Sequence, residues 1–184
     1  DLLRRCPCSV LLVGHGGAAG PSRIAAAVNT STEDGEADQA MNARIAEMAL
    51  RMAELEGGSV TLLHAWEVFA EGMVRGLASP DGYADYLAVA RRRAEDDFAR
   101  FRQSLGERLS GVPAELRRGE PEDVIPAFVV AEGIDLLVMG SVARRGISGF
   151  LVGNTAERVL PRLPCSVLVV KPGDSAVSEG AGPA

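Results

Sequence analysis

The chain has 184 residues, 47% of them hydrophobic and 24% charged, and its formal net charge is −6 at pH 7. This length suits a single domain with a substantial core. The acidic balance argues against nonspecific nucleic-acid binding, which needs clustered Lys and Arg on phosphates, and no apolar run reaches the ~18 residues of a membrane span. We therefore expect neither a specific nucleic-acid partner nor membrane association.

The first half of the chain alternates strand-like and helix-like patterns. The apolar run at residues 23–29 predicts a strand. Apolar residues spaced four and three apart over residues 37–56 predict an amphipathic helix, and the apolar run at residues 59–66 predicts a second strand. Gly and Pro punctuate residues 67–82, where we expect a mobile crossover or lid. A further apolar stripe predicts a helix over residues 83–109.

The second half continues this alternation. A short strand is predicted over residues 113–118, followed by a helix that Pro121 opens and that ends near Gly133. Residues 134–139 form a continuous apolar run, which is typical of a strand buried on both faces. The rest of the chain is predicted as a loop over 140–152, a helix over 153–162, a strand over 165–171 and a disordered tail over 173–184.

The two ends of the chain carry a repeated segment. Residues 3–13 (LRRCPCSVLLV) align with residues 160–170 (LPRLPCSVLVV), and eight of the eleven positions are identical. We interpret residues 1–13 as the last strand of a preceding copy of the same domain and residues 14–22 as a linker. Residues 23–172 then form the main domain. Chance similarity of two short apolar strands is the alternative.

The order of elements predicts an α/β fold. Five strands alternating with four helices indicate a doubly wound, mainly parallel five-stranded sheet with helices on both faces, Rossmann-like, plus an extra N-terminal strand. In such a sheet a ligand binds beyond the carboxyl ends of the strands, where the strand order reverses. We therefore expect a site near Asn29 and Gly140, which follow the first and fourth strands.

The loop that begins at Gly140 has the composition of an anion-binding loop. Gly140-Ser141-Val142-Ala143 is followed, nine residues later, by Gly153-Asn154-Thr155 at a predicted helix start. Backbone N–H groups at such a start favour an anion, and Arg144 and Arg145 add positive charge. The loop either binds a phosphate or is merely a tight glycine-rich connection, and the sequence leaves both interpretations open.

The cysteines and histidines do not suggest a metal site. Cys6, Cys8 and Cys165 lack zinc-ligand spacing, and we interpret them as reduced thiols of a cytoplasmic protein. No signal-peptide order is present at the N-terminus. We interpret His64 as a hydrogen-bonded strand-end residue rather than a general base, and no catalytic residue is assigned.

Together these features resemble one domain of the universal stress protein family. Gly140 and Gly153 match the family's motif G-x2-G-x9-G-(S/T), residues 62–65 (LLHA) match the end of its second strand, and residues 164–170 match its closing strand. The resemblance covers residues 23–172. The sequence of the glycine-rich loop is most similar to that of the second domain of tandem, E-type members.

The resemblance implies a non-enzymatic, cytoplasmic stress-response protein that binds ATP or AMP. It puts Asn29 and Ala65 beside the adenine, and Gly140, Ala143, Gly153 and Asn154 around the ribose and phosphates. The complete candidate site is Asn29, Ala65, Gly140, Ser141, Ala143, Arg144, Gly153, Asn154 and Thr155.

The resemblance also implies association through the last strand, as a homodimer or a tandem pseudo-dimer. Residues 8–13 are then expected to pair antiparallel with residues 165–170 of the same chain or of a partner chain. Asn29, Ala143 and Asn154 depart from the family pattern, which keeps open an interaction module with no nucleotide binding. A weak ATP-hydrolysing enzyme that uses Arg144 and Arg145 is a further alternative.

Overall fold

A computed structural model of the chain describes residues 3, 6, 8–14, 20, 22–31, 36–141 and 154–172. The strands are β1 (Val10–Leu12), β2 (Arg23–Ala27), β3 (Ser59–Trp66), β4 (Ala114–Arg118), β5 (Leu136–Gly140) and β6 (Ser166–Val170). The helices are α2 (Glu36–Glu56), α3 (Glu71–Leu77), α4 (Pro80–Ser104), α5 (Glu107–Ser110), α6 (Pro121–Glu132), α7 (Asn154–Val159) and the 3-10 turn η1 (Leu160–Arg162). Most of the predicted linker and the whole predicted tail lie outside the described residues.

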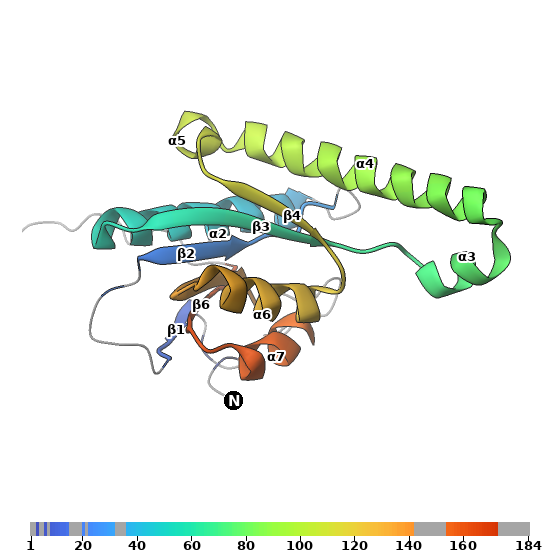
Figure 1. The fold of residues 1–184 in the computed structure, drawn as a ribbon. Coiled ribbons are helices and arrows are strands. Elements are labelled where there is room, and N and C mark those ends of the chain that lie inside the picture. The colour runs from blue at the N-terminus through green and yellow to red at the C-terminus, as the bar shows by residue number, and fades with distance from the viewer. Residues whose placement is uncertain are drawn as a thin grey trace, which may run out of the picture.

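The strands form one six-stranded sheet in the order β1-β6-β5-β2-β3-β4 (Figure 1). β2 pairs in parallel with both β3 and β5, and the remaining neighbours β3–β4 and β5–β6 are parallel too. Only β1 is antiparallel, along the outer edge of β6. The predicted fold class, with its extra N-terminal strand, is confirmed.

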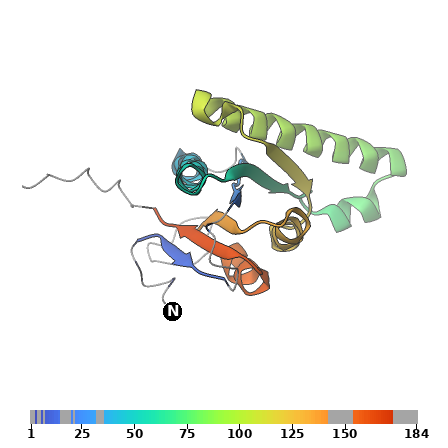
Figure 2. The same ribbon diagram turned by 60° about the vertical axis from the view of Figure 1, so that its left-hand side comes forward.

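Helices cover both faces of the sheet, as Figures 1 and 2 show. On one face, Ile45 of α2 and Phe98 of α4 share a core with Leu62 of β3. On the other face, Val129 of α6 and Val159 of α7 share a core with the inner strands. Successive side chains of a strand point to opposite faces of the sheet and so enter the two cores in turn. This is why β5 is apolar at nearly every position.

The β1–β6 pair is symmetric in sequence and in space. Leu11 lies directly opposite Leu168, and these two residues occupy the same position in the repeated segment. The main-chain N–H of Gly14 donates to Ser166 Oγ, and that of Lys171 donates to Ser9 Oγ, each at 3.1 Å. A local two-fold axis therefore relates the two repeated segments in β1 and β6. The predicted antiparallel pairing is confirmed.

We predicted no helix or strand in residues 67–82, and this prediction is wrong for the segment. It contains α3 and the start of α4, because Pro80 at the first helical turn and Ser79 as a cap begin a helix there; Ser79 Oγ accepts from the Gly82 N–H at 3.1 Å. The following helix ends earlier than predicted. Gly106, with a φ of +72°, separates α4 from α5.

The buried face of α2 differs slightly from the predicted stripe. The stripe predicted burial of Leu55, which is 78% exposed, while Ile45, Ala46 and Ala49 form the buried centre. Small alanines let the helix lie close to the sheet, and the methionines fill the margins of the core. Among the described helices, none combines the length and apolar character that crossing a bilayer requires.

Candidate functional site

The predicted site lies where the strand order reverses. From β2 the chain moves outward to β3 and β4, then returns to β5 and β6 on the other side. β2 and β5 are direct neighbours, with Ala27 opposite Met139. Their carboxyl ends therefore bring Asn29 and Gly140 to the same edge of the sheet, as the sequence predicted.

The main chain at Asn29 is held by a side chain of α2. The Asn29 N–H donates to Asn42 Oδ1 at 3.0 Å, and Asn42 Nδ2 donates to the Asn29 carbonyl. Asn42 is only 5% exposed. This pair of hydrogen bonds fixes the chain just beyond β2, where the half-buried Asn29 side chain begins. We did not predict a role for Asn42, because its burial and its contact with Asn29 become visible only in the folded structure.

Thr30 carries an unsatisfied polar atom at the same edge. Its side chain is 7% exposed, and its Oγ1 has no hydrogen-bond partner among the described residues. A threonine hydroxyl can donate one hydrogen bond and accept others, and burying it without a partner costs free energy. The hydroxyl could therefore form a hydrogen bond with a polar group that enters beside Asn29.

Gly140 and Ser141 continue from β5 at this edge. A Cβ at Gly140 would lie 3.3 Å from Ile45 Cδ1 and 3.6 Å from Met41 Cγ, so glycine permits the close approach of α2. Ser141 is 2% exposed, and its N–H donates to the Val170 carbonyl at 3.0 Å. The turn that leaves β5 is thus tied to β6.

His64 and Ala65 lie at the carboxyl end of β3. His64 is 5% exposed, and its Nδ1 lies 3.1 Å from the Val28 carbonyl, to which a protonated Nδ1 donates. Its ring centroid lies 5.8 Å from that of Phe98. The interpretation of His64 as a hydrogen-bonded strand-end residue is confirmed. Ala65 is half-buried, one strand away from Asn29.

The remaining predicted site residues belong to the region before and within α7. Ala143, Arg144 and Gly153 lie outside the described residues, as does the side chain of Asn154. Thr155 is exposed in the first turn of α7. The structure therefore brings together Asn29, Gly140 and Ser141 at one edge of the sheet.

The opposite, amino edge of the β2–β5 pair carries a carboxylate. Asp135 Oδ2 accepts hydrogen bonds from the Arg23 N–H at 3.0 Å, from the Ser22 N–H at 3.1 Å and from Ser22 Oγ at 3.0 Å. The hydrogen bond from the Arg23 main chain, followed by those from Ser22, holds the pKa of Asp135 below its usual value. Among the described residues, no group of three or more His, Cys, Asp or Glu side chains could hold a metal ion.

Comparison with known proteins matches residues 34–171 to the family described as "Universal stress protein family". The chain is similar to the "Universal stress protein E homolog" of Haemophilus influenzae, at 34% identity over 94% of this chain and 55% of that protein. It resembles the structure of a functionally unknown protein from Pseudomonas aeruginosa PAO1, with a TM-score of 0.69 at 30% identity, over 94% of this chain and 55% of that one. The chain thus spans about half the length of these relatives. A universal stress protein solved in complex with cAMP shares the fold, with a TM-score of 0.50 at 17% identity, over 83% of this chain and 98% of that one.

Proposed function

The chain belongs to the universal stress protein family, and we propose on that basis that it is a stress-response protein whose β2–β5 edge binds an adenine nucleotide, ATP or AMP. The observation that carries this proposal is the buried Thr30 hydroxyl, which has no hydrogen-bond partner in the described part of the chain. It lies next to Asn29, at the point where the strand order reverses. A polar ligand at this edge would satisfy that hydroxyl.

Asn29 has hydrogen-bonding groups that fit adenine. An asparagine side chain offers one acceptor and a two-hydrogen donor on the same amide, and this pattern complements the adjacent amino group and ring nitrogen of adenine. The fold relative solved with cAMP also holds an adenine nucleotide. On the phosphate side, the family resemblance assigns Gly140, Gly153 and Asn154, with Arg144 adding positive charge.

We propose binding rather than turnover of the nucleotide. His64, the histidine on β3, is buried in the core and is held by the Val28 carbonyl, so it does not face a ligand as a general base. The nucleotide then acts as a ligand that changes the association of the protein with its partners.

Calorimetric titration with ATP and with AMP tests the proposal. We expect saturable heat for at least one nucleotide, and we expect Thr30→Val to weaken its affinity about fivefold because the valine lacks the hydroxyl. Thr61→Val removes the same group from the middle of β3 and serves as the matched control.

No heat at millimolar nucleotide would overturn the proposal and favour an interaction module with an empty cleft. Release of inorganic phosphate from ATP, lost when Arg144 and Arg145 are both changed to Ala, would instead favour a weak ATP-hydrolysing enzyme.

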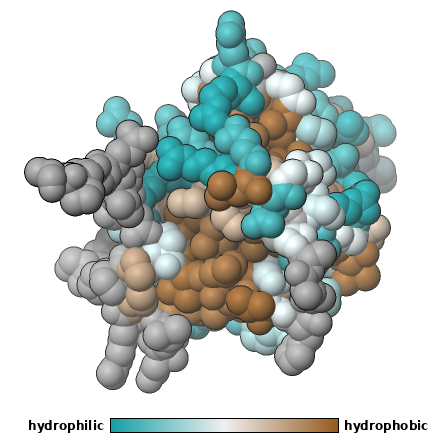
Figure 3. Space-filling model, turned by 90° about the vertical axis from the view of Figure 1, so that its left-hand side faces the viewer, coloured by the Kyte–Doolittle hydropathy of each residue, from teal (hydrophilic) through white to brown (hydrophobic). Residues whose placement is uncertain are grey.

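We further propose that the last-strand edge joins two copies of the domain, as a tandem pseudo-dimer or a homodimer. The two-fold relation between β1 and β6 supports this, because two copies of one edge meet in that way in an isologous dimer. Beside this joint, Leu11 and Val13 are 49% and 78% exposed. Figure 3 shows apolar residues gathered in the middle of the face that it displays, and such a patch is typical of a surface that a partner covers.

Truncation of residues 1–14 tests the joint. Loss of β1 uncovers the edge of β6, and we expect the truncated chain to dimerise through antiparallel β6 strands while the full chain does not. Light scattering coupled to size exclusion measures the mass, and circular dichroism checks that the truncated chain is folded. A folded truncated chain that stays monomeric would contradict the proposal.

The cysteines support a cytoplasmic place of action. Cys6, Cys8 and Cys165 form no disulfide, which is the usual state of thiols in a reducing compartment. Burial raises the pKa of the Cys165 thiol, which disfavours its reactive thiolate form.

A further inference from the structure

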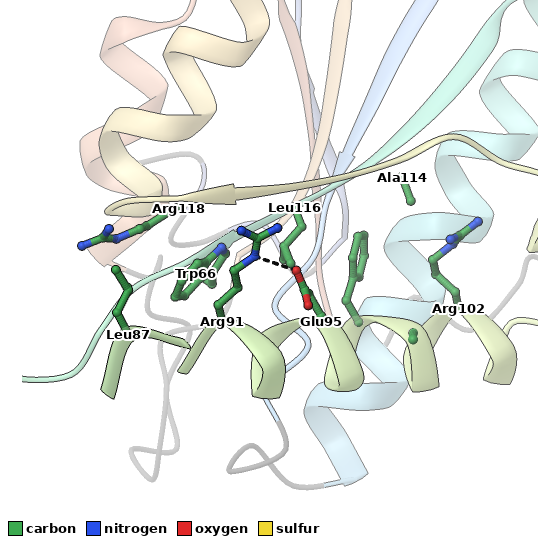
Figure 4. A pocket seen from close by; sticks show the side chains of 10 residues that line it. Trp66, Leu87, Arg91, Glu95, Arg102, Ala114, Leu116 and Arg118 are labelled. Atoms are coloured by element: carbon green, nitrogen blue, oxygen red, sulfur yellow. Dashed lines mark hydrogen bonds and ion pairs between the residues drawn. The ribbon is translucent and has the colours of Figure 1, made fainter. Parts of the chain in front are cut away.

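A hollow lies at the edge of the sheet remote from β1, between α4 and β4 (Figure 4). Its volume is about 510 Å³, which lies within the usual range of small-molecule sites. None of the candidate nucleotide-site residues lines it. We call this hollow the α4 groove.

The floor of the α4 groove is apolar. Trp66 of β3 and Phe98 of α4 are 8% and 5% exposed, and Leu116 of β4 lies beside them. Trp66 lies directly opposite Arg118 in the β3–β4 register, so both strands end at the same end of the groove. The floor therefore offers two aromatic rings to a flat apolar group.

The wall formed by α4 is charged. Arg91 and Glu95 lie four residues apart, on one face of the helix. Figure 4 shows these two side chains joined by an ion pair above the apolar floor. Three arginines and one glutamate line the α4 groove, although the chain as a whole has a net charge of −6. Local charge therefore favours an anion where the overall charge does not.

The arginines differ in how firmly they are engaged. Arg118 donates to Tyr83 Oη at 3.2 Å and also pairs with Glu71, which ties α3 to the end of the groove. Arg91 Nε pairs with Glu95 Oε1 at 2.7 Å, but the two side chains are 69% and 47% exposed. An exposed pair of this kind contributes little, so a ligand carboxylate can replace Glu95 on Arg91.

We propose that the α4 groove is a second binding site, and that it takes an arylalkyl carboxylate, a flat apolar ring joined to one carboxylate. The ring packs against Trp66 and Phe98. The carboxylate accepts two hydrogen bonds from the Arg91 guanidinium, whose planar geometry matches a carboxylate. Glu95 is the internal competitor for the same guanidinium.

Trp66 reports on this site directly, because it is the only tryptophan of the chain. Phenylbutyrate is a suitable probe, since it has the required ring and carboxylate and does not absorb where tryptophan is excited. We expect a saturable change in tryptophan emission of the full chain, with a dissociation constant of about 1 mM or below. Phenylbutanol, the neutral analogue, and butyrate, which lacks the ring, should each bind more weakly.

Two substitutions should shift this affinity in opposite directions. Arg91→Gln removes the cation and should weaken phenylbutyrate binding about fivefold, whereas Glu95→Gln removes the competitor and should tighten it about threefold. Arg92→Gln, an exposed neighbour on α4, is the matched control and should leave the dissociation constant unchanged.

Three results would each overturn the proposal. The first is an emission of Trp66 that phenylbutyrate does not change. The second is binding of phenylbutanol as tight as that of phenylbutyrate, which would show that the groove binds an apolar ring without recognising the carboxylate. The third is an equal effect of Arg91→Gln and Arg92→Gln, which would show general electrostatics rather than a site. Because the candidate nucleotide site shares no residue with the groove, calorimetry with ATP fails or succeeds independently of these outcomes.

Discussion

At the amino ends of β2 and β5 a charged side chain satisfies the main chain, whereas at their carboxyl ends a neutral one does. Asp135 accepts three hydrogen bonds from Ser22 and Arg23. Asn42 donates one and accepts one at Asn29. Both side chains hold neighbouring strands in place, but among the described residues the carboxyl edge also carries a buried hydroxyl without a partner, that of Thr30.

The two ends of this strand pair differ in whether their buried polar groups are satisfied within the protein. At the carboxyl edge, Thr30 keeps a buried hydroxyl without a partner among the described residues, and position 140 is a glycine against α2. Such features cost stability unless a ligand or a close packing contact uses them. The carboxyl edge is therefore the one for which we propose a ligand, in line with the general rule for open α/β sheets.

The largest expected effect comes from removing the clamp at the carboxyl edge. Asn42→Ala leaves the N–H and carbonyl of Asn29 without their partner inside the protein and opens a small cavity, so we expect a loss of about 3 kcal/mol in the free energy of unfolding. Urea denaturation measures it. Gln39→Ala, at an exposed position of the same helix, should change stability little; an equal loss in both variants would contradict the role of the clamp.

A smaller effect is expected at the amino edge. Asp135→Asn keeps the shape of the side chain but weakens the hydrogen bonds that it accepts, and we expect a loss of about 1 kcal/mol at neutral pH, a value reduced because the carboxylate is exposed. Asp96→Asn on α4 is the control. Should Asp135→Asn prove more costly than Asn42→Ala, the comparison between the two edges would be reversed.

The Asp135 contribution should depend on pH with a definite sign. Its pKa in the folded protein is lowered, chiefly by the Arg23 main-chain hydrogen bond, so the stabilisation is present above the unfolded pKa of about 4 and is lost as the pH falls through the folded value. The difference in stability between the parent chain and Asp135→Asn should therefore shrink below about pH 4. A difference that stays constant down to acid pH would argue against a charged acceptor.

The smallest effect on stability is expected for Thr30→Val. Valine has nearly the same shape and removes the unsatisfied hydroxyl, so stability should stay the same or rise by about 0.5 kcal/mol. Thermal unfolding without ligand measures it. A clear loss of stability would indicate that the hydroxyl is satisfied within the protein, and would remove the main support for a ligand at this edge.

The sequence predicted most of the fold because the fold rests on local periodicity. β3 was predicted with the bounds that the structure has, residues 59–66, and the repeated segment predicted the β1–β6 pair. α3 was missed because Gly72 and Gly76 read as loop residues. A Cβ added at either glycine would point into open space, so the two residues cost the helix little more than their own propensity.

The candidate site was predicted only in part, for a different physical reason. Asn29 and Gly140 follow strands, and the rule for open sheets places them together. Asn42 and Asp135 act through hydrogen bonds to residues 13 and more than 100 positions away, at Asn29 and at Arg23. No local pattern encodes such contacts, and they become visible only when the strands are in register.

The local two-fold at the β1–β6 joint also affects how this protein can change over time. In a pair of identical chains, one substitution at the joint alters both sides of the contact together. Here the two sides are encoded separately, so each can diverge alone. They already differ at several points: Leu12 matches Val169, for example, and a Cβ at Gly14 would lie 2.8 Å from the Cys165 carbonyl carbon, while the matching position holds the buried Lys171.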